Sequence, residues 1–428
     1  MIYYLYARAG HRADLYMSII FHIDVNSAFL SWSALKALQE GSAIDLRTIP
    51  SIVGGDQATR HGIVVAKSIP AKEYGIKTAE TVAEAFRKCP GLVMVAPDHE
   101  YYSRQSHSLM DFLSGICPVI EQASIDECYM DFEPIRDKYA SPEAAAALIK
   151  DSVRDTFGFT VNIGISDRKV LAKMASDFKK PDLVHTLYVS EIRNKMWPLP
   201  VEDLYMCGKS SAIRLQTMGI RTIGDLAQTD PVLVESWMKK HGQMLWNFAN
   251  GIDDSVVHPE KAAAKGVGNS TTLSANAETR EAALPELEKL CLSVSRRLKK
   301  KNVLAAGLTV EIKYADFVSV SHQMTLGQDK YSCTNASIQL YRYAVELFDT
   351  LWNGEPIRLL GVRASRLTTT EAKEENRQMT LFDFEKETEK KRQEKEKQEK
   401  ETRIEEALGK IYSKYGQNAV KKGSLSKQ

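Results

Sequence analysis

Two separate segments of the chain alternate short apolar runs typical of β-strands with amphipathic stretches typical of helices. In residues 19–185, runs such as IIFHIDV and FTVNIGIS alternate with helical stretches such as FLSWSALKAL. Residues 267–369 follow the order strand, helix, strand, strand, helix, strand. The first pattern predicts an α/β layer domain, and the second predicts a βαββαβ unit. The sequence therefore predicts a multidomain protein that combines α/β and α+β units.

The composition between these segments sets the expected domain limits. A length of 428 residues fits roughly three domains. The stretch between the two alternating segments is helical, and the C-terminal stretch is rich in Glu and Lys with little apolar content. Met17 directly precedes the first strong strand, so an extension is expected before it. The expected parts are an N-terminal extension (1–17), an α/β domain (18–199), a helical domain (200–260), the βαββαβ domain (261–370) and a charged tail (371–428).

The composition also excludes two classes of protein. No stretch of about 18 residues is wholly apolar, which excludes a membrane-spanning helix. Charged residues interrupt the N-terminal stretch and make it a poor signal peptide. The six cysteines lack CxxC spacing, which favours reduced thiols over a disulfide framework or a zinc site. We therefore expect a cytoplasmic protein with no membrane partner.

Three carboxylates lie at the ends of predicted strands. Asp24 ends the run IIFHIDV, and Asp126 and Glu127 adjoin at the bend of a hairpin predicted over 119–132. Clustered carboxylates repel one another unless a cation neutralises them, and Mg²⁺ prefers such oxygen ligands. Two Mg²⁺ ions about 3.5–4 Å apart would serve an in-line phosphoryl displacement. The alternative is that Asp24 caps the helix predicted over 26–38 and that the pair belongs to a turn.

Several motifs in a fixed order resemble the Y-family DNA polymerases, the translesion enzymes of the DNA polymerase IV and UmuC kind. The motifs are HIDVNSAFL, AKSIPAKEYGIKT, SIDECYMDF, NIGIS with KVLAKMASDFKKPD, and a Gly-Lys segment. The resemblance covers roughly 18–370. It implies a right-hand polymerase with palm and fingers in 18–199 (fingers roughly 30–90), a helical thumb in 200–260 and a βαββαβ little finger in 261–370. It further implies an error-prone, monomeric enzyme that adds dNTPs to the primer 3′ end of primer-template DNA without proofreading.

The resemblance also assigns roles to single residues of the first motifs. Asp24, Asp126 and Glu127, with the backbone carbonyl of Val25, match the ligands of two Mg²⁺ ions per active site. Phe29 matches the aromatic steric gate that packs under the sugar and excludes a 2′-hydroxyl. From position alone, Phe29 could equally belong to an ordinary helix core.

Basic residues of the later motifs match nucleotide contacts. Lys180, directly before Pro181, matches a lysine that touches the incoming triphosphate. The tyrosine and arginine that family members place three residues apart are here Ile69 and Lys72, so we expect Lys72 to bind phosphate and Ile69 to be a packing position only. Lys169 and Lys173, at i and i+4 on one helix, belong either to the site or to a solvated face.

Contacts with DNA are predicted in the thumb and the little finger. The paired-glycine hairpin of the family thumb is here Met206-Cys207-Gly208-Lys209, in which one glycine is missing. The resemblance points to Gly208 and Lys209 as backbone contacts. In the little finger we expect Lys313 and Arg363 among the DNA contacts.

The sequence QMTLFDF resembles a sliding-clamp motif. Gln378 would lie at the edge of a pocket on the clamp (the β subunit), while Leu381, Phe382 and Phe384 would bury apolar surface. An exposed Leu-Phe-x-Phe within a charged tail has no core to join, which favours a partner over chance occurrence.

Two other hypotheses stay open. A catalytically weak, clamp- and DNA-binding relative that acts as an accessory repair protein is favoured by Ile69 and Met206, while the intact carboxylate set argues against it. Another nucleotidyl-transfer enzyme on a ferredoxin-like palm, such as a cyclase, would have no use for the thumb, the βαββαβ unit or the clamp-like tail.

The net charge of +2 does not exclude DNA as a partner, because the charge is divided along the chain. Counted by segment, it is −3 over 1–265, +3 over 266–370 and +2 over 371–428. The acidic excess lies in the part that holds the predicted metal ligands, where Mg²⁺ would offset some of it. We therefore expect DNA binding through local patches and the clamp tether, with a modest dependence on salt.

Overall fold

The computed structural model describes residues 18–55, 62–260, 263–327 and 331–369, with the single residues Arg403 and Ala407. The chain divides into two compact units, one made of the described residues up to 260 and the other of those from 263 onward. The predicted N-terminal extension, residues 56–61 and the predicted clamp motif lie outside the described residues.

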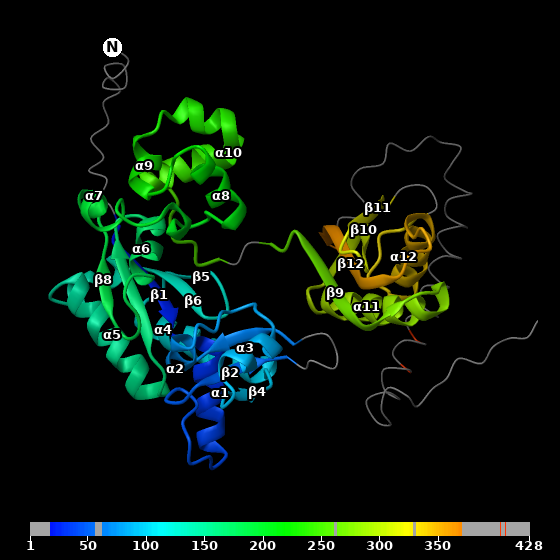
Figure 1. The fold of residues 1–428 in the computed structure, drawn as a ribbon, viewed down its shortest axis with the longest axis horizontal. Helices are drawn as coiled ribbons and strands as arrows, with labels where there is room; N and C mark the ends of the chain where they lie inside the picture. The colour runs from blue at the N-terminus through cyan, green and yellow to red at the C-terminus, as the bar shows by residue number, and fades with distance from the viewer. Residues whose placement is uncertain are drawn as a thin grey trace, which may run out of the picture. The chain divides into compact units, whose positions relative to one another are not determined.

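A five-stranded sheet forms the centre of the first unit (Figure 1). Its order is β5-β6-β1-β7-β8, with β1 antiparallel to β6 and β7, and β8 parallel to β7. All residues of β1 are buried, as expected for a strand that is covered on both faces. The strands are β1 (Ile20–Val25), β5 (Ile120–Gln122), β6 (Glu127–Asp131), β7 (Val161–Ser166) and β8 (Val184–Thr186).

Helices cover both faces of this sheet. The helices around it are α1 (Ala28–Gln39), α4 (His99–Ile116), α5 (Pro142–Phe157), α6 (Lys169–Ser176) and α7 (Ile192–Lys195), with 3-10 turns at Glu133–Lys138 and Val189–Glu191. Phe21, Ile23 and Val25 of β1 pack with buried residues of α1, α4 and α5. His22 and Asp24 point to the opposite face, because successive strand residues alternate, and they contact residues of α6. The sheet thus places two polar side chains under α6.

The segment predicted to form the fingers contains a smaller three-stranded sheet with two short helices. The strand order is β3-β2-β4, in which β2 (Ser51–Gly54) is antiparallel to β3 (Val64–Lys67) and parallel to β4 (Val93–Val95). The helices α2 (Ile69–Glu73) and α3 (Val82–Lys88) share a small core with this sheet.

The segment predicted to form the thumb is helical and shares its core with α6. Its helices are α8 (Lys209–Thr217), α9 (Ile223–Gln228) and α10 (Pro231–Ala249), preceded by a 3-10 turn at Val201–Asp203. Helix α10 is kinked at Lys239, whose φ is 57°. Leu171 and Met174 of α6 lie in one buried cluster with Leu215 and Leu226 of the thumb. Helix α6 therefore joins the thumb core to the polar face of the palm sheet.

The second unit is the predicted βαββαβ fold. It comprises β9 (Gly266–Ala277), α11 (Arg280–Lys300), β10 (Val303–Tyr314), β11 (Ser319–Thr325), α12 (Ser337–Leu351) and β12 (Ile357–Thr369). The antiparallel sheet has the order β11-β10-β12-β9, and both helices pack on one face (Figure 1). Leu308, Val310 and Ile312 are buried under the helices, so Thr309 and Glu311 lie on the open face.

The sequence predicted the elements well but not all of their ends. A proline stops a helix, so the sequence alone would allow α6 to continue up to Pro181, but α6 ends at Ser176 and the chain then turns back toward β1. The domain limits themselves remain predictions.

Candidate active site

Asp24 and Glu127 lie opposite one another on neighbouring strands. The β1–β6 register pairs them directly, and directly opposed like charges are destabilising unless cations offset them. Asp24 is only 7% exposed, which strengthens this requirement because a buried carboxylate must be paired. The alternative in which Asp24 caps α1 is wrong: the N-cap residue is Ser27, and its side chain makes no capping bond.

Two lysines supply the positive charge. Lys173 Nζ lies 2.6 Å from Glu127 Oε1 and 3.3 Å from Asp24 Oδ2. Lys180 Nζ lies 2.9 Å from Asp24 Oδ1. Asp177 lies 3.2 Å from Lys173 and 3.0 Å from Lys180. Asp24, Lys173, Asp177 and Lys180 therefore form a closed ring of alternating charges, the charge ring, to which Glu127 is attached through Lys173.

The structure separates the two lysines that the sequence left ambiguous. Lys173 belongs to the charge ring, whereas Lys169, one turn earlier on α6, pairs with Glu121. The sequence analysis missed Asp177. Its position four residues after Lys173, at the end of the same helix, is the signal that could have identified it, because this spacing brings side chains together on a helix.

The network shifts the pKa values of its members. Burial alone would raise the pKa of Asp24, but Lys180 and Lys173 outweigh burial and hold it below its ordinary value. Partial burial, together with a hydrogen bond to Asp24, raises the pKa of Glu127 to about 7. Burial favours a neutral Lys173, yet Asp24 and Glu127 outweigh it and raise the pKa of that amine. Asp24 and Glu127 therefore carry negative charge that the ammonium groups of Lys173 and Lys180 stabilise.

The third predicted ligand, Asp126, hydrogen-bonds within its own turn. Ser124 Oγ donates a hydrogen bond of 2.6 Å to Asp126 Oδ1, and the amide of Val25 donates to the backbone carbonyl of Asp126 at 3.1 Å. Within the part of the chain that the structure describes, no three His, Cys, Asp or Glu side chains lie close enough together to hold a metal ion. The structure thus brings Asp24 and Glu127 together but does not add Asp126 to them as a third ligand.

Two residues of β7 that the sequence analysis missed position this network. Asn162 is fully buried, and its side-chain amide donates to the carbonyls of Ser176 and Lys179 at 3.2 and 2.9 Å. It thereby holds the turn that returns Lys180 to Asp24. Gly164 lies under α6, where a Cβ atom would be 2.5 Å from the Ser176 amide nitrogen. Only glycine allows α6 to approach the sheet this closely.

His22 is a further buried group beside the pair. Its Nδ1 lies 2.8 Å from Ser176 Oγ, which itself donates to the carbonyl of Lys173. The hydroxyl proton is thus committed, so His22 donates from Nδ1 and carries a lone pair on Nε2. That Nε2 has no hydrogen-bond partner among the described residues and lies 4.0 Å from Glu127 Oε2. Burial, followed by the charge of Lys173, lowers the pKa of His22 to about 3, so the ring is neutral.

Phe29 is the second residue of α1, the helix that follows β1. Its ring stacks on Tyr102 of α4, with centroids 4.6 Å apart and an interplanar angle of 11°. Ser27, two residues earlier, has a φ of 49°, the left-handed conformation that turns the chain sharply after Asp24. Stacking on Tyr102 fixes the ring orientation, as a gate requires, although it is equally compatible with a core position.

In the fingers, one expectation is wrong. Ile69 is 52% exposed at the start of α2, so it is not a packing position. Helix α2 is only five residues long and buries Ala71 alone. Lys72 is exposed on the same helix. Lys67, on β3, is a nearby cation that the sequence analysis did not single out, and burial followed by the charge of Lys72 lowers its pKa.

In the predicted thumb, Met206 adopts the left-handed backbone conformation that glycine usually adopts. Met206 has a φ of 67° and is 53% exposed. Gly208 is the N-cap residue of α8, with no side-chain cap, and Lys209 is the first residue of that helix. The amides at this helix end are therefore available to an anion such as a phosphate.

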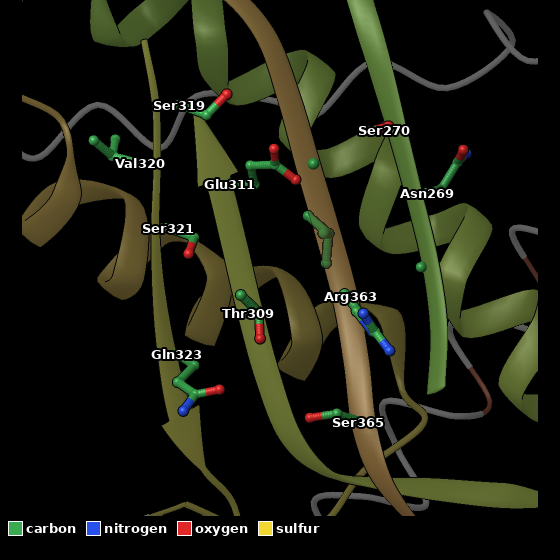
Figure 2. A pocket seen from close by; sticks show the side chains of 13 residues that line it. Asn269, Ser270, Thr309, Glu311, Ser319, Val320, Ser321, Gln323, Arg363 and Ser365 are labelled. Carbon is green, nitrogen blue, oxygen red and sulfur yellow. The ribbon is translucent and has the colours of Figure 1, made fainter. Parts of the chain in front are cut away.

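The open face of the little-finger sheet is a shallow concavity of about 740 Å³ (Figure 2). Arg363 lies at its centre and is exposed, while Thr309 is its register partner. Glycines make room for the arginine: a Cβ atom at Gly268 would lie 3.2 Å from the Arg363 side chain. Lys313 shares this face, and so does Glu311. The face is thus polar and carries charges of both signs.

The donor set of the palm fits a divalent cation. Asp24 and Glu127 offer carboxylate oxygens, the ligands that Mg²⁺ and Mn²⁺ prefer. The negative charge of these carboxylates already attracts the ammonium groups of Lys173 and Lys180. The buried Nε2 of His22, which no described residue hydrogen-bonds, marks a further polar position beside Glu127.

Comparisons with known proteins match nearly the whole chain. The model described as the impB/mucB/samB family matches residues 23–177, and the model of the C-terminal domain of that family matches residues 264–381. A model described as the thumb domain of DNA polymerase-iota matches residues 202–253. The solved structure of a Y-family DNA polymerase chimera is similar with a TM-score of 0.71 and 21% identity, covering 82% of this chain and 100% of that one.

Curated relatives match over almost their full length. DNA polymerase IV of Clostridium acetobutylicum is 40% identical over 95% of this chain and 98% of its own. DNA polymerase IV of Bacillus velezensis is 34% identical over 96% of this chain and 94% of its own. The fold is that of a Y-family polymerase, with palm, thumb and βαββαβ little finger. The chain belongs to the impB/mucB/samB family.

Proposed function

We propose that this DNA-directed DNA polymerase extends primer 3′ ends by two-Mg²⁺ nucleotidyl transfer, carries out error-prone translesion synthesis without proofreading, and is recruited by the sliding clamp. The observation that carries the proposal is the Asp24–Glu127 pair on central strands of the palm, with lysines at hydrogen-bonding distance. Family membership supports the same reaction, since relatives matched over nearly their full length are named DNA polymerase IV.

Asp24 and Glu127 would hold the ions, together with Asp126 and the backbone carbonyl of Val25. Bound Mg²⁺ supplies charge stabilisation at the attacking and leaving oxygens of the displacement. The chain itself contributes positioning: the β1–β6 register fixes the two carboxylates, and α6 covers Asp24, which is buried. Such fixed charges need little reorganisation during the reaction.

The nucleotide would meet Lys180 and Phe29. Lys180 is one-third exposed and bonds to Asp24 and Asp177, so it can exchange Asp177 for a phosphate oxygen of the incoming nucleotide. Lys72 would add charge from the fingers, without the bidentate fork of an arginine. Phe29, held by its stack on Tyr102, would exclude a 2′-hydroxyl.

DNA would lie against the thumb and the open face of the little finger. The first amides of α8, from Lys209 onward, suit a backbone phosphate, and Gly208 directly before them has no side chain that would block its approach. Arg363 and Lys313 supply cations on the little-finger face, and serine and threonine hydroxyls lie around Arg363 (Figure 2). Contacts of this kind position a duplex without reading its sequence.

The remaining parts of the proposal concern the clamp, the oligomeric state and the cellular compartment. Gln378, Leu381, Phe382 and Phe384 would bind the clamp β subunit, and the enzyme would work as a monomer. No helix in the described part of the chain is long and apolar enough to cross a membrane. The buried cysteines, all of them among the described residues, form no disulfides, which supports a reducing compartment such as the cytoplasm.

Single-nucleotide primer extension tests the proposal. The full chain is assayed on undamaged and abasic templates, with Mg²⁺ or with EDTA, beside Asp126→Ala. We expect extension on both templates that EDTA abolishes and that Asp126→Ala reduces at least about a hundredfold, a loss typical of removing one charge-stabilising group. If the wild type does not extend a primer, the accessory clamp- and DNA-binding hypothesis is favoured.

A further inference from the structure

Lys173 is held more tightly than a residue of a solvated helix face would be. It is 8% exposed, and its amine contacts Glu127, Asp24 and Asp177 at 2.6, 3.3 and 3.2 Å. A buried ammonium group is stable only when such partners surround it, and the pKa of Lys173 is raised accordingly. Its position on α6 is fixed in turn, because the helix packs against Gly164 of the sheet.

The oxygens that Lys173 engages are those a divalent cation would need. Glu127 Oε1 and Asp24 Oδ2 both accept hydrogen bonds from Lys173. Asp24 Oδ1 accepts one from Lys180. A divalent cation bound by the two carboxylates would therefore share their oxygens with the ammonium group of Lys173. The two positive charges would lie close together and repel one another strongly.

We propose that Lys173 is a positioning residue that serves as a built-in counter-cation: it holds Asp24 and Glu127 together in the absence of a divalent ion and competes with that ion for them. The inference rests on the metal site of the proposed function. It predicts that Lys173 stabilises the fold when divalent ions are removed and lowers the affinity of the site for those ions.

The same helix provides a matched control. Lys169 lies one turn before Lys173, is 9% exposed, and pairs with Glu121 at 2.7 and 2.8 Å. The side chains of Glu121 and Glu127 are 27% and 26% exposed. The two lysines therefore match in helix, burial and type of partner, but only Lys173 touches Asp24 and Glu127.

Mn²⁺ titration of the full chain, followed by electron paramagnetic resonance of the free ion, tests the proposal on the wild type, Lys173→Met and Lys169→Met. We expect Lys173→Met to bind Mn²⁺ at least tenfold more tightly than the wild type, and Lys169→Met to bind it as the wild type does. Thermal unfolding gives an independent readout: both variants should unfold earlier in EDTA, and Mn²⁺ should restore only Lys173→Met. Lys173→Gln takes the place of Lys173→Met if the latter does not fold.

Unchanged or weaker Mn²⁺ binding by the Lys173 variant, or equal gains in both variants, would overturn the proposal. Absence of binding in every protein would overturn it as well. Primer extension by the wild type at saturating Mg²⁺ decides the proposed function separately. A wild type that does not extend a primer refutes the polymerase proposal, while the Mn²⁺ affinities still decide the role of Lys173.

Discussion

Gly164 makes the position of α6 open to a direct test. A Cβ atom at this residue would lie 2.5 Å from the Ser176 amide nitrogen and closer still to the Ala172 carbonyl oxygen, and both atoms belong to the backbone of α6. Backbone atoms cannot rotate away, so Gly164→Ala must push α6 about 1 Å from the sheet, since packed interiors tolerate no such overlap. Overpacking of this kind costs about 1–3 kcal/mol or more. We expect a loss of about 3 kcal/mol, because every residue of α6 is buried.

The assay is urea unfolding, with hydrogen–deuterium exchange of α6 as the local probe. Gly164→Ala should shift the unfolding midpoint down and increase exchange in α6, and primer extension should fall because Lys180, the proposed nucleotide contact after α6, moves away from Asp24. Gly115→Ala is the control. Gly115 is an exposed residue of α4, and no described atom outside its own helix turn lies within 4 Å of the place a Cβ atom would take, so this change should stabilise by up to about 1 kcal/mol. A Gly164→Ala protein as stable and as active as the wild type would refute the reasoning.

Three further predictions concern substrate and partners. Phe29→Val should raise ribonucleotide insertion at least about tenfold in primer extension, as expected when a shape filter is lost; unchanged sugar selectivity would contradict the gate. Arg363→Ala should weaken duplex binding and reduce the salt slope by about 1 in fluorescence anisotropy titrations, whereas Arg280→Ala, paired with Asp349 on α12, should leave the slope unchanged. Equal slopes for the two variants would count against the little-finger contact. Replacing Leu381 and Phe382 together by alanine should weaken binding to the clamp more than about a hundredfold in surface plasmon resonance, since each buried side chain contributes about 1.5–3 kcal/mol. An unchanged affinity for the clamp would show that the clamp binds another part of the chain.

Local signals explain why much of the fold could be predicted from the sequence. Helix α5 begins after Ser141, whose hydroxyl accepts the Ala144 amide, and ends at Gly158 in the left-handed conformation, as the capping residues indicated. The βαββαβ unit followed from alternation and periodicity in the same way. The carboxylates at 24 and 127 were predicted to cluster, and the strand register confirms that they face one another.

What could not be predicted depends on contacts between distant segments. The role of Asn162 arises only when the turn after α6 folds back onto β7, and no local pattern marks a buried asparagine as an anchor. Ile69 was expected to pack, but the short α2 leaves it exposed. Met206 retains a left-handed φ of 67° in place of a glycine, so the loss of that glycine changes the backbone less than the sequence implied.

The central claim is that the Asp24–Glu127 pair carries the chemistry. The most direct measurement is the single-turnover rate of correct nucleotide insertion at saturating Mg²⁺ for Asp24→Asn and for Asp131→Asn. Asp131 also lies on β6, at the far end of the same β1–β6 pairing, opposite Ile20. We predict that Asp24→Asn lowers the rate at least about a hundredfold while Asp131→Asn stays within about threefold of the wild type. An Asp24→Asn enzyme that inserts nucleotides as fast as Asp131→Asn would contradict the account.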